Sequence, residues 1–124
     1  MNQDTMTING EEWVKKSSIA PAALEVNTDG LEYCIVRASS AGVFAGYVLQ
    51  LNGDTATLLK ARRLWYWDGA ASLSELAMHG VAKPENCKFP CELAKVLVMG
   101  VIEVIPATKE AKASIDGVPV WTAR

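Results

Sequence analysis

The dipeptide Asn52-Gly53 stands between two strand-like stretches and constrains the fold more than any other feature of the chain. Both residues tolerate positive φ, which the central positions of a type I′ turn demand. Residues 43–51 and 55–67 are therefore predicted to pair as an antiparallel hairpin. Residues 31–38 alternate between two faces and reach this hairpin through a turn, which extends the prediction to a β meander.

The third predicted strand is long enough to require a distortion. Residues 55–67 amount to thirteen residues, more than a strand usually contains, so a bend or bulge is expected near Ala61. Residues 95–105 form a nearly continuous apolar run broken at Gly100, which predicts two strands bent or bulged at the glycine. Residues 88–93 are predicted to be extended at a sheet edge or a bulge, because Pro90 has no N–H to donate.

Two short helices are predicted after the hairpin. Ser72 and Glu75 have the spacing of a capping box, and Gly80 is a residue type favoured just past a helix end. Thr108 is the predicted cap of a second helix that stops at residues 116–117. The expected fold class is α+β: an antiparallel meander or hairpin sheet of about four to six strands, decorated with two short helices.

The length of 124 residues fits one domain with a modest core. Residues 1–30 are predicted to be an N-terminal extension with a possible short helix near residues 9–16, and residues 31–124 to be a single α+β domain. The N-terminus is polar and no apolar run approaches the length of a membrane span, so no membrane contact is expected. The three cysteines are an odd number, which favours a reduced, cytoplasmic setting.

Charge and motif content argue against several functions. The net charge is −2, and residues 60–124 carry nine basic and seven acidic side chains against three and seven in residues 1–59. Long nucleic acid is therefore not an expected partner, and a small anion is expected to bind the second half. The chain lacks the nucleophile, phosphate-loop and dinucleotide motifs, so neither an enzyme nor a cofactor is expected. Cys87, Cys91 and His79 lack a fourth zinc ligand, so no metal is expected.

Residues 60–67 carry the most unusual composition. Arg62 and Arg63 stand directly before Leu64 and three consecutive aromatic residues, Trp65 to Trp67. Guanidinium groups hold phosphate in a bidentate fork, and indole rings stack on bases. The same composition is also typical of core and sheet-edge packing, and both interpretations stay open.

A small ligand that is both anionic and aromatic fits the remaining side chains. Phe44 and Phe89 add flat rings, Asn86 adds a pair of groups for a base edge, and Lys88 adds a cation. Lys109 and Lys112 share one face at the start of the second helix. The predicted ligand-binding residues are Arg62, Arg63, Trp65, Phe89, Asn86, Lys88, Phe44, Lys109 and Lys112. The site is expected where Arg62 or Arg63, Trp65 and Phe89 meet the turn at Asn86 and the start of the second helix, across a subunit boundary. Strand alternation allows at most one of the two arginines to bind unless a bulge intervenes.

Several sequence strings resemble a family of small phage proteins. These strings span residues 40–47, 61–67, 70–77, 87–90, 103–108 and 118–121, so the resemblance runs from about residue 33 to about residue 121. That family is similar to the phage sponge proteins that counter the Thoeris and CBASS defence systems. Such sponges bind a cyclic nucleotide signal, either a glyco-cyclic ADP-ribose or a cyclic di- or trinucleotide, without cleaving it.

The resemblance implies a non-catalytic binder that sequesters an immune signal in the cytoplasm of an infected bacterial cell. It also implies a homo-oligomer, a dimer or a dimer-based hexamer, with ligand pockets between subunits. Burying Trp65, Trp67 and Trp121 in so small a domain favours association independently. The alternative function is a small phage structural or host-protein interaction module with an aromatic interface.

Overall fold

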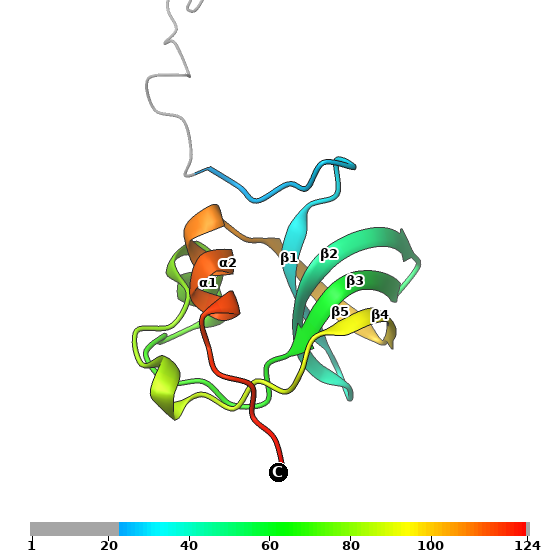
Figure 1. Ribbon diagram of the computed structural model, residues 1–124. Coiled ribbons are helices and arrows are strands. Elements are labelled where there is room, and N and C mark those ends of the chain that lie inside the picture. The colour runs from blue at the N-terminus through cyan, green and yellow to red at the C-terminus, as the bar shows by residue number, and fades with distance from the viewer. Residues whose placement is uncertain (1–22, 124) are drawn as a thin grey trace, which may run out of the picture.

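A computed structural model describes residues 23–123 of the chain. In chain order, its elements are β1 (Tyr33–Ala38), β2 (Gly42–Asn52), β3 (Thr55–Arg63), α1 (Leu73–His79), the 3-10 turn η2 (Pro84–Asn86), β4 (Leu93–Met99), β5 (Val101–Pro106) and α2 (Lys109–Asp116). All strand pairs are antiparallel, and α1 and α2 lie together beside the sheet (Figure 1). The predicted α+β class with a β meander is confirmed. The predicted helix near residues 9–16 lies outside the described residues.

The sheet is strongly curled, as its connectivity requires. The strand order is β4-β3-β2-β1-β5, so β4 and β5 lie at opposite edges although only Gly100 separates them in sequence. Gly100 has a φ of +78°, and its carbonyl accepts a hydrogen bond from Ser39 N at 2.9 Å. Val101 N donates to the Asp54 carbonyl at 2.9 Å, which ties the same corner to the β2–β3 turn. The predicted break at Gly100 is thus a corner that turns the chain from one sheet edge to the other.

The curl creates a core made of strands and their turns. Its buried members are Cys34, Val36, Ala38, Phe44, Ala56, Leu58, Ala61 and Val98. None of them comes from a helix, so it is the bending of the sheet upon itself that removes these side chains from water. We call this group the strand core.

The helices cover the other face of the sheet and form a second core. Tyr33 and Ile35 on β1 pack in one cluster with Leu76 of α1 and Ile115 of α2. Both predicted helix caps are present: Ser72 Oγ accepts from Glu75 N at 3.1 Å, and Thr108 Oγ1 accepts from Ala111 N at 3.0 Å. We call this group the helix-side core.

The predicted turn and bulge are confirmed. Asn52 pairs with Thr55 across the two-residue turn, and Gly53 has a φ of +63°. The register between β2 and β3 shifts near Ala61, where Lys60 adopts a φ of +51°. β3 ends at Arg63 rather than at residue 67, because Leu64 onward leaves the sheet.

Residues 23–30 of the predicted extension contact the domain closely. Glu25 N donates to the Ala107 carbonyl at 2.9 Å, and Tyr33 N donates to the Glu25 carbonyl at 3.0 Å. The Tyr47 hydroxyl donates to Glu25 Oε2 at 2.8 Å. This segment therefore packs across the ends of β1 and β5. Within residues 23–123, no helix has the length and apolar content needed to cross a membrane.

Candidate functional site

Arg62 is a buried structural residue. It is 5% exposed, and its guanidinium donates to four backbone carbonyls. Nη2 donates to Phe89 at 2.7 Å, Nε to Pro90 at 3.0 Å, and Nη1 to Ile115 at 2.8 Å and Val118 at 3.0 Å. Four of its five N–H bonds are therefore used, and burial lowers the pKa of the group.

These contacts correct two parts of the predicted site. Arg62 is not a free phosphate ligand, because it binds together the chain after α2 and the segment before β4. The end of α2, at Ile115, meets Arg62, whereas the sequence predicted its start. A cation is favoured there because the C-terminal carbonyls of a helix carry partial negative charge.

The two phenylalanines do not offer their rings to a ligand. Phe89 is fully buried, with the Arg62 guanidinium carbon 5.5 Å from its ring centroid. Phe44 is 1% exposed and belongs to the strand core. The prediction that these rings stack on a base is corrected, because both rings are already covered by protein.

Arg63 lies on the opposite side of β3 and keeps most of its donors. Its guanidinium carbon stands 4.4 Å from the centroid of the Phe44 ring, and Nη1 donates to the Ala41 carbonyl at 2.6 Å. No carboxylate of residues 23–123 pairs with it. Four N–H bonds remain for a ligand, and the Phe44 ring holds the plane of the group in place.

A pocket of about 370 Å³ opens beside Arg63. Its lining residues are Ser40, Ala41, Gly42, Val43, Arg63, Leu64, Trp65 and Trp67. Trp65 is 63% exposed, and Trp67 is half-buried against the helix-side core. We call this the Arg63 pocket; it brings together two of the predicted ligand residues, Arg63 and Trp65.

The other predicted residues lie outside this pocket. Asn86 Nδ2 donates to Asp68 Oδ2 at 2.9 Å. Lys88 Nζ lies 5.9 Å from the Tyr66 ring centroid and 5.6 Å from that of Trp121. These side chains form exposed clusters of their own.

The lysine pair on α2 is engaged in ion pairs. Lys109 Nζ lies 3.3 Å from Glu25 Oε1, and Lys112 pairs with Asp116. Lys112 Nζ also stands 5.3 Å from the Tyr33 ring centroid. Neither lysine lines the Arg63 pocket, so the predicted anion site at the start of α2 lies apart from it and stays a prediction.

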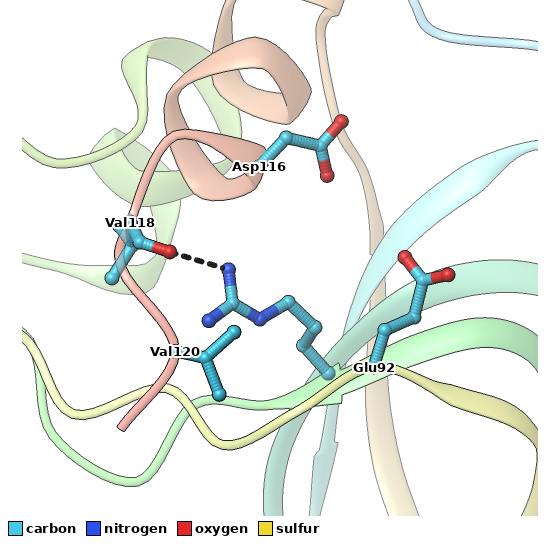
Figure 2. A pocket seen from close by; sticks show the side chains of 5 residues that line it. Glu92, Asp116, Val118 and Val120 are labelled. Carbon is cyan, nitrogen blue, oxygen red and sulfur yellow. Dashed lines mark hydrogen bonds between the residues drawn. The ribbon is translucent and has the colours of Figure 1, made fainter. Parts of the chain in front are cut away.

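A second pocket, of about 290 Å³, is unsuited to phosphate. It is lined by Arg62, Glu92, Asp116, Val118 and Val120. Figure 2 shows the carboxylates of Glu92 and Asp116 on its rim, and the dashed hydrogen bond to the Val118 carbonyl. Two carboxylates repel an anion, and the arginine beside them is occupied.

No group of three or more metal-ligating side chains occurs among residues 23–123. Within those residues, the Arg63 pocket therefore offers a guanidinium and two indoles as its binding groups. A family comparison covers the same region: residues 31–115 match a family described as a domain of unknown function, DUF6948.

The chain belongs to the DUF6948 family. No curated protein and no solved structure matches the chain. All the residues that line the Arg63 pocket fall within the DUF6948 span, whereas Val118 and Val120 of the second pocket lie beyond it. The DUF6948 domain thus contains the whole Arg63 pocket.

The predicted residue set omitted Trp67 and the turn at residues 40–43, which the structure places in the pocket wall. The signal for Trp67 was the spacing of two residues from Trp65, which puts both side chains on one side of an extended chain. No local pattern links the turn at residues 40–43 to Arg63, because the pairing of β2 with β3 brings them together.

Proposed function

We propose that this protein is a non-catalytic sponge that binds and sequesters a cyclic nucleotide immune signal. The observation that carries the proposal is that one pocket holds both Arg63, which pairs with no carboxylate of residues 23–123, and the exposed indole of Trp65. A cyclic nucleotide carries an ionised phosphate and a flat base. A guanidinium binds the phosphate through charge-assisted hydrogen bonds, and an indole stacks on the base.

The chemistry of the pocket lining supports binding without turnover. Among its eight residues, Arg63 is the one ionisable group, and Ser40 has no base beside it in the lining. Hydrolysis of a phosphodiester needs a general base, a metal ion or an activated nucleophile. Sequestration needs affinity alone, which an arginine and two indoles supply.

The sequence resemblance supports the biological setting of the proposal. The strings shared with small phage proteins related to the Thoeris and CBASS sponges include residues 40–47 and 61–67. Those two segments supply all eight lining residues of the Arg63 pocket. We place the protein in the cytoplasm of an infected bacterial cell, where the immune signals are made.

A ligand panel tests the proposal directly. We expect one of cyclic di-AMP, cyclic di-GMP, cyclic GMP-AMP, cyclic triadenylate or glyco-cyclic ADP-ribose to raise the melting temperature of the protein. A ligand at one hundred times its Kd adds about 2.7 kcal/mol of stability. The ligand released by heat denaturation is expected to be chemically intact.

Matched arginine variants locate the site. Arg63→Ala removes the pocket guanidinium and is expected to abolish the thermal shift. Arg37→Ala removes an exposed arginine that pairs with Glu103 at 2.9 Å, and is expected to leave the shift unchanged. The absence of a shift with every ligand, or a released ligand that has been cleaved, contradicts the proposal.

The proposal includes a homo-oligomer, a dimer or a dimer-based hexamer, with pockets near subunit boundaries. Trp65 and Trp121 remain exposed in the single chain, and exposed aromatics are enriched where proteins associate. Light scattering at micromolar concentration is expected to give a mass of at least two chains. A monomeric mass contradicts this part of the proposal.

A second candidate function, an interaction module, rests on a different observation. Tyr66 and Trp121 are exposed and flank Lys88 on a surface separate from the Arg63 pocket. Aromatic and cationic side chains of this kind are typical of interface hot spots. Loss of binding to a phage or host protein in Trp121→Ala, with ligand binding retained, favours this function.

A further inference from the structure

We infer that the Arg63 pocket takes a purine nucleotide by inserting its base between the indoles of Trp65 and Trp67. This inference rests on the proposed function, because it names how the same pocket holds the base of its ligand. It goes further by assigning Trp67 a binding role and by specifying the class of base.

The backbone around Tyr66 holds the two indoles on one side. Lys88 N donates to the Tyr66 carbonyl at 2.7 Å, and Tyr66 N donates to the Lys88 carbonyl at 3.3 Å, which makes an antiparallel bridge. Trp65 N also donates to the Lys88 carbonyl, at 3.2 Å, so two successive amides share one acceptor, as in a β-bulge. Trp65 and Trp67 both line the pocket, whereas the Tyr66 ring lies by Lys88 instead.

The spacing of the two tryptophans suits one flat ring. A fully extended chain advances about 3.3 Å per residue, so the Cα atoms of residues two apart are separated by roughly 6.6 Å at full extension. Stacked bases are about 3.4 Å apart, so a base stacked on both sides needs about twice that spacing. Neither indole stacks on another aromatic ring of residues 23–123. Within these residues, a base that stacks on either indole therefore has no other aromatic ring to displace.

The two indoles differ in burial. Trp67 packs on the helix-side core and supplies a fixed wall. Trp65 is mostly exposed and supplies a wall that closes over the base. A fixed first wall lowers the entropy cost of binding, because only one side chain has to become ordered.

Arg63 sets the position of the phosphate. It lies two residues before Trp65 and lines the same pocket. The contact with the Phe44 ring orients its guanidinium group, which has four N–H donors available. A ligand that fills both positions has a base and a phosphate on one sugar. Purines overlap more of an indole than pyrimidines do, so AMP and GMP are expected to bind more tightly than CMP and UMP.

Calorimetry with mononucleotides tests the inference. The probes are AMP, GMP, CMP and UMP, together with ribose 5-phosphate, which has the phosphate and no base. We expect AMP and GMP to quench tryptophan fluorescence and to bind more tightly than the others. Trp65→Ala is expected to weaken AMP binding roughly 5- to 140-fold, the equivalent of losing about 1–3 kcal/mol of base stacking.

Matched variants separate stacking from loss of fold. Tyr66→Ala removes an adjacent exposed ring that does not line the pocket, and is expected to leave AMP binding unchanged. Trp67→Phe keeps an aromatic ring packed on the helix-side core but reduces the area on which a base can stack. It is expected to weaken AMP binding less than Trp65→Ala does. Circular dichroism checks the fold of each variant.

Three results overturn the inference: no measurable binding of any purine nucleotide, equal affinity of AMP and ribose 5-phosphate, or parental AMP affinity in folded Trp65→Ala. The proposed function fails separately. If a cyclic nucleotide binds through Arg63 while Trp65→Ala keeps full affinity, the insertion of the base between the indoles is wrong and the proposed sponge function is retained. If AMP follows the expected pattern and no cyclic nucleotide binds, the proposed sponge function is wrong and the insertion of the base is retained.

Discussion

Arg62 and Arg63 are adjacent in sequence and lie in opposite environments. Arg62 pairs across the sheet with Ala45 of the helix-side core and donates to four backbone carbonyls. Arg63 pairs with Phe44 of the strand core and keeps most of its donors at the edge of a pocket. Because strand alternation places the two side chains on opposite faces, Arg62 stabilises the fold and Arg63 is available to bind a ligand.

Removal of Arg62 is expected to destabilise the fold severely. Arg62→Met keeps much of the side-chain volume but removes a donor from four carbonyls. Ile115 and Phe89 still accept from the backbone N–H groups of Val118 and Trp121, so the carbonyls of Pro90 and Val118 lose the donor that the structure gives them. Each unsatisfied buried group costs about 1–3 kcal/mol, so a total loss of at least about 2 kcal/mol is expected in urea denaturation. Arg37→Met, which breaks an exposed ion pair, is the control and is expected to cost about 0–1 kcal/mol. Equal losses in the two variants contradict the structural role.

Gly80 is required where the two helices meet. It ends α1 with a φ of +78°, and a Cβ at this position would stand 2.3 Å from Ser114 Cβ on α2. Gly80→Ala therefore combines backbone strain with a clash and is expected to cost more than about 2 kcal/mol. Thermal unfolding measures the loss, and Gly53→Ala is the comparison, since it shares a positive φ but has open space around it. If both variants lose the same stability, the clash with Ser114 contributes nothing.

The three cysteines are expected to differ in reactivity. Cys91 is exposed, whereas burial raises the pKa of the Cys34 thiol to about 11 and also raises the pKa of Cys87. Because the thiolate is the reactive form, a thiol reagent at pH 8 should modify one cysteine rapidly and the others only after unfolding. Cys91→Ser should remove the fast phase. Two or more fast thiols in the native protein would show that the described packing is incorrect.

Acidification is expected to weaken the contact of residue 25 with the sheet. The hydrogen bond from Tyr47, followed by the ammonium of Lys109, lowers the pKa of Glu25 below its ordinary value of 4.5. A carboxyl group with a lowered folded pKa stabilises the protein above the unfolded pKa, and the contribution is lost as pH falls through the folded pKa. Tyr47→Phe is therefore expected to cost about 1 kcal/mol at pH 7 and less at pH 3. Urea denaturation at both pH values measures the difference, and an equal cost at both contradicts the role of the ionised carboxylate.

Local sequence signals predicted the elements because their causes are local. The turn at Asn52-Gly53 depends on positive φ, and the bulge near Ala61 depends on strand length. The first turn of each helix depends on a capping hydroxyl group, that of Ser72 or of Thr108. Each cause acts within a few residues, so sequence spacing is enough to detect it. The same local signals bounded the strands to within a few residues.

The candidate site was predicted only in part, since its members come from distant segments. Trp65 and Arg63 are close in sequence and were both named. Phe89 and Arg62 were named too, yet the packing of the chain after α2 covers them. A ring or a guanidinium has the same composition whether it is buried or exposed, so residue type alone does not separate the two roles.

The sequence by itself determined the α+β class, the hairpin, the helix caps and the concentration of cations and indoles at residues 62–67, because these depend on propensity and short-range spacing. Only the tertiary structure decided that β4 and β5 occupy opposite edges, that Arg62 serves the core, and that the turn at residues 40–43 completes a pocket beside Arg63. The physical reason is that curling of the sheet brings segments far apart in the chain into contact, and that contact determines which polar groups are used internally and which remain for a ligand.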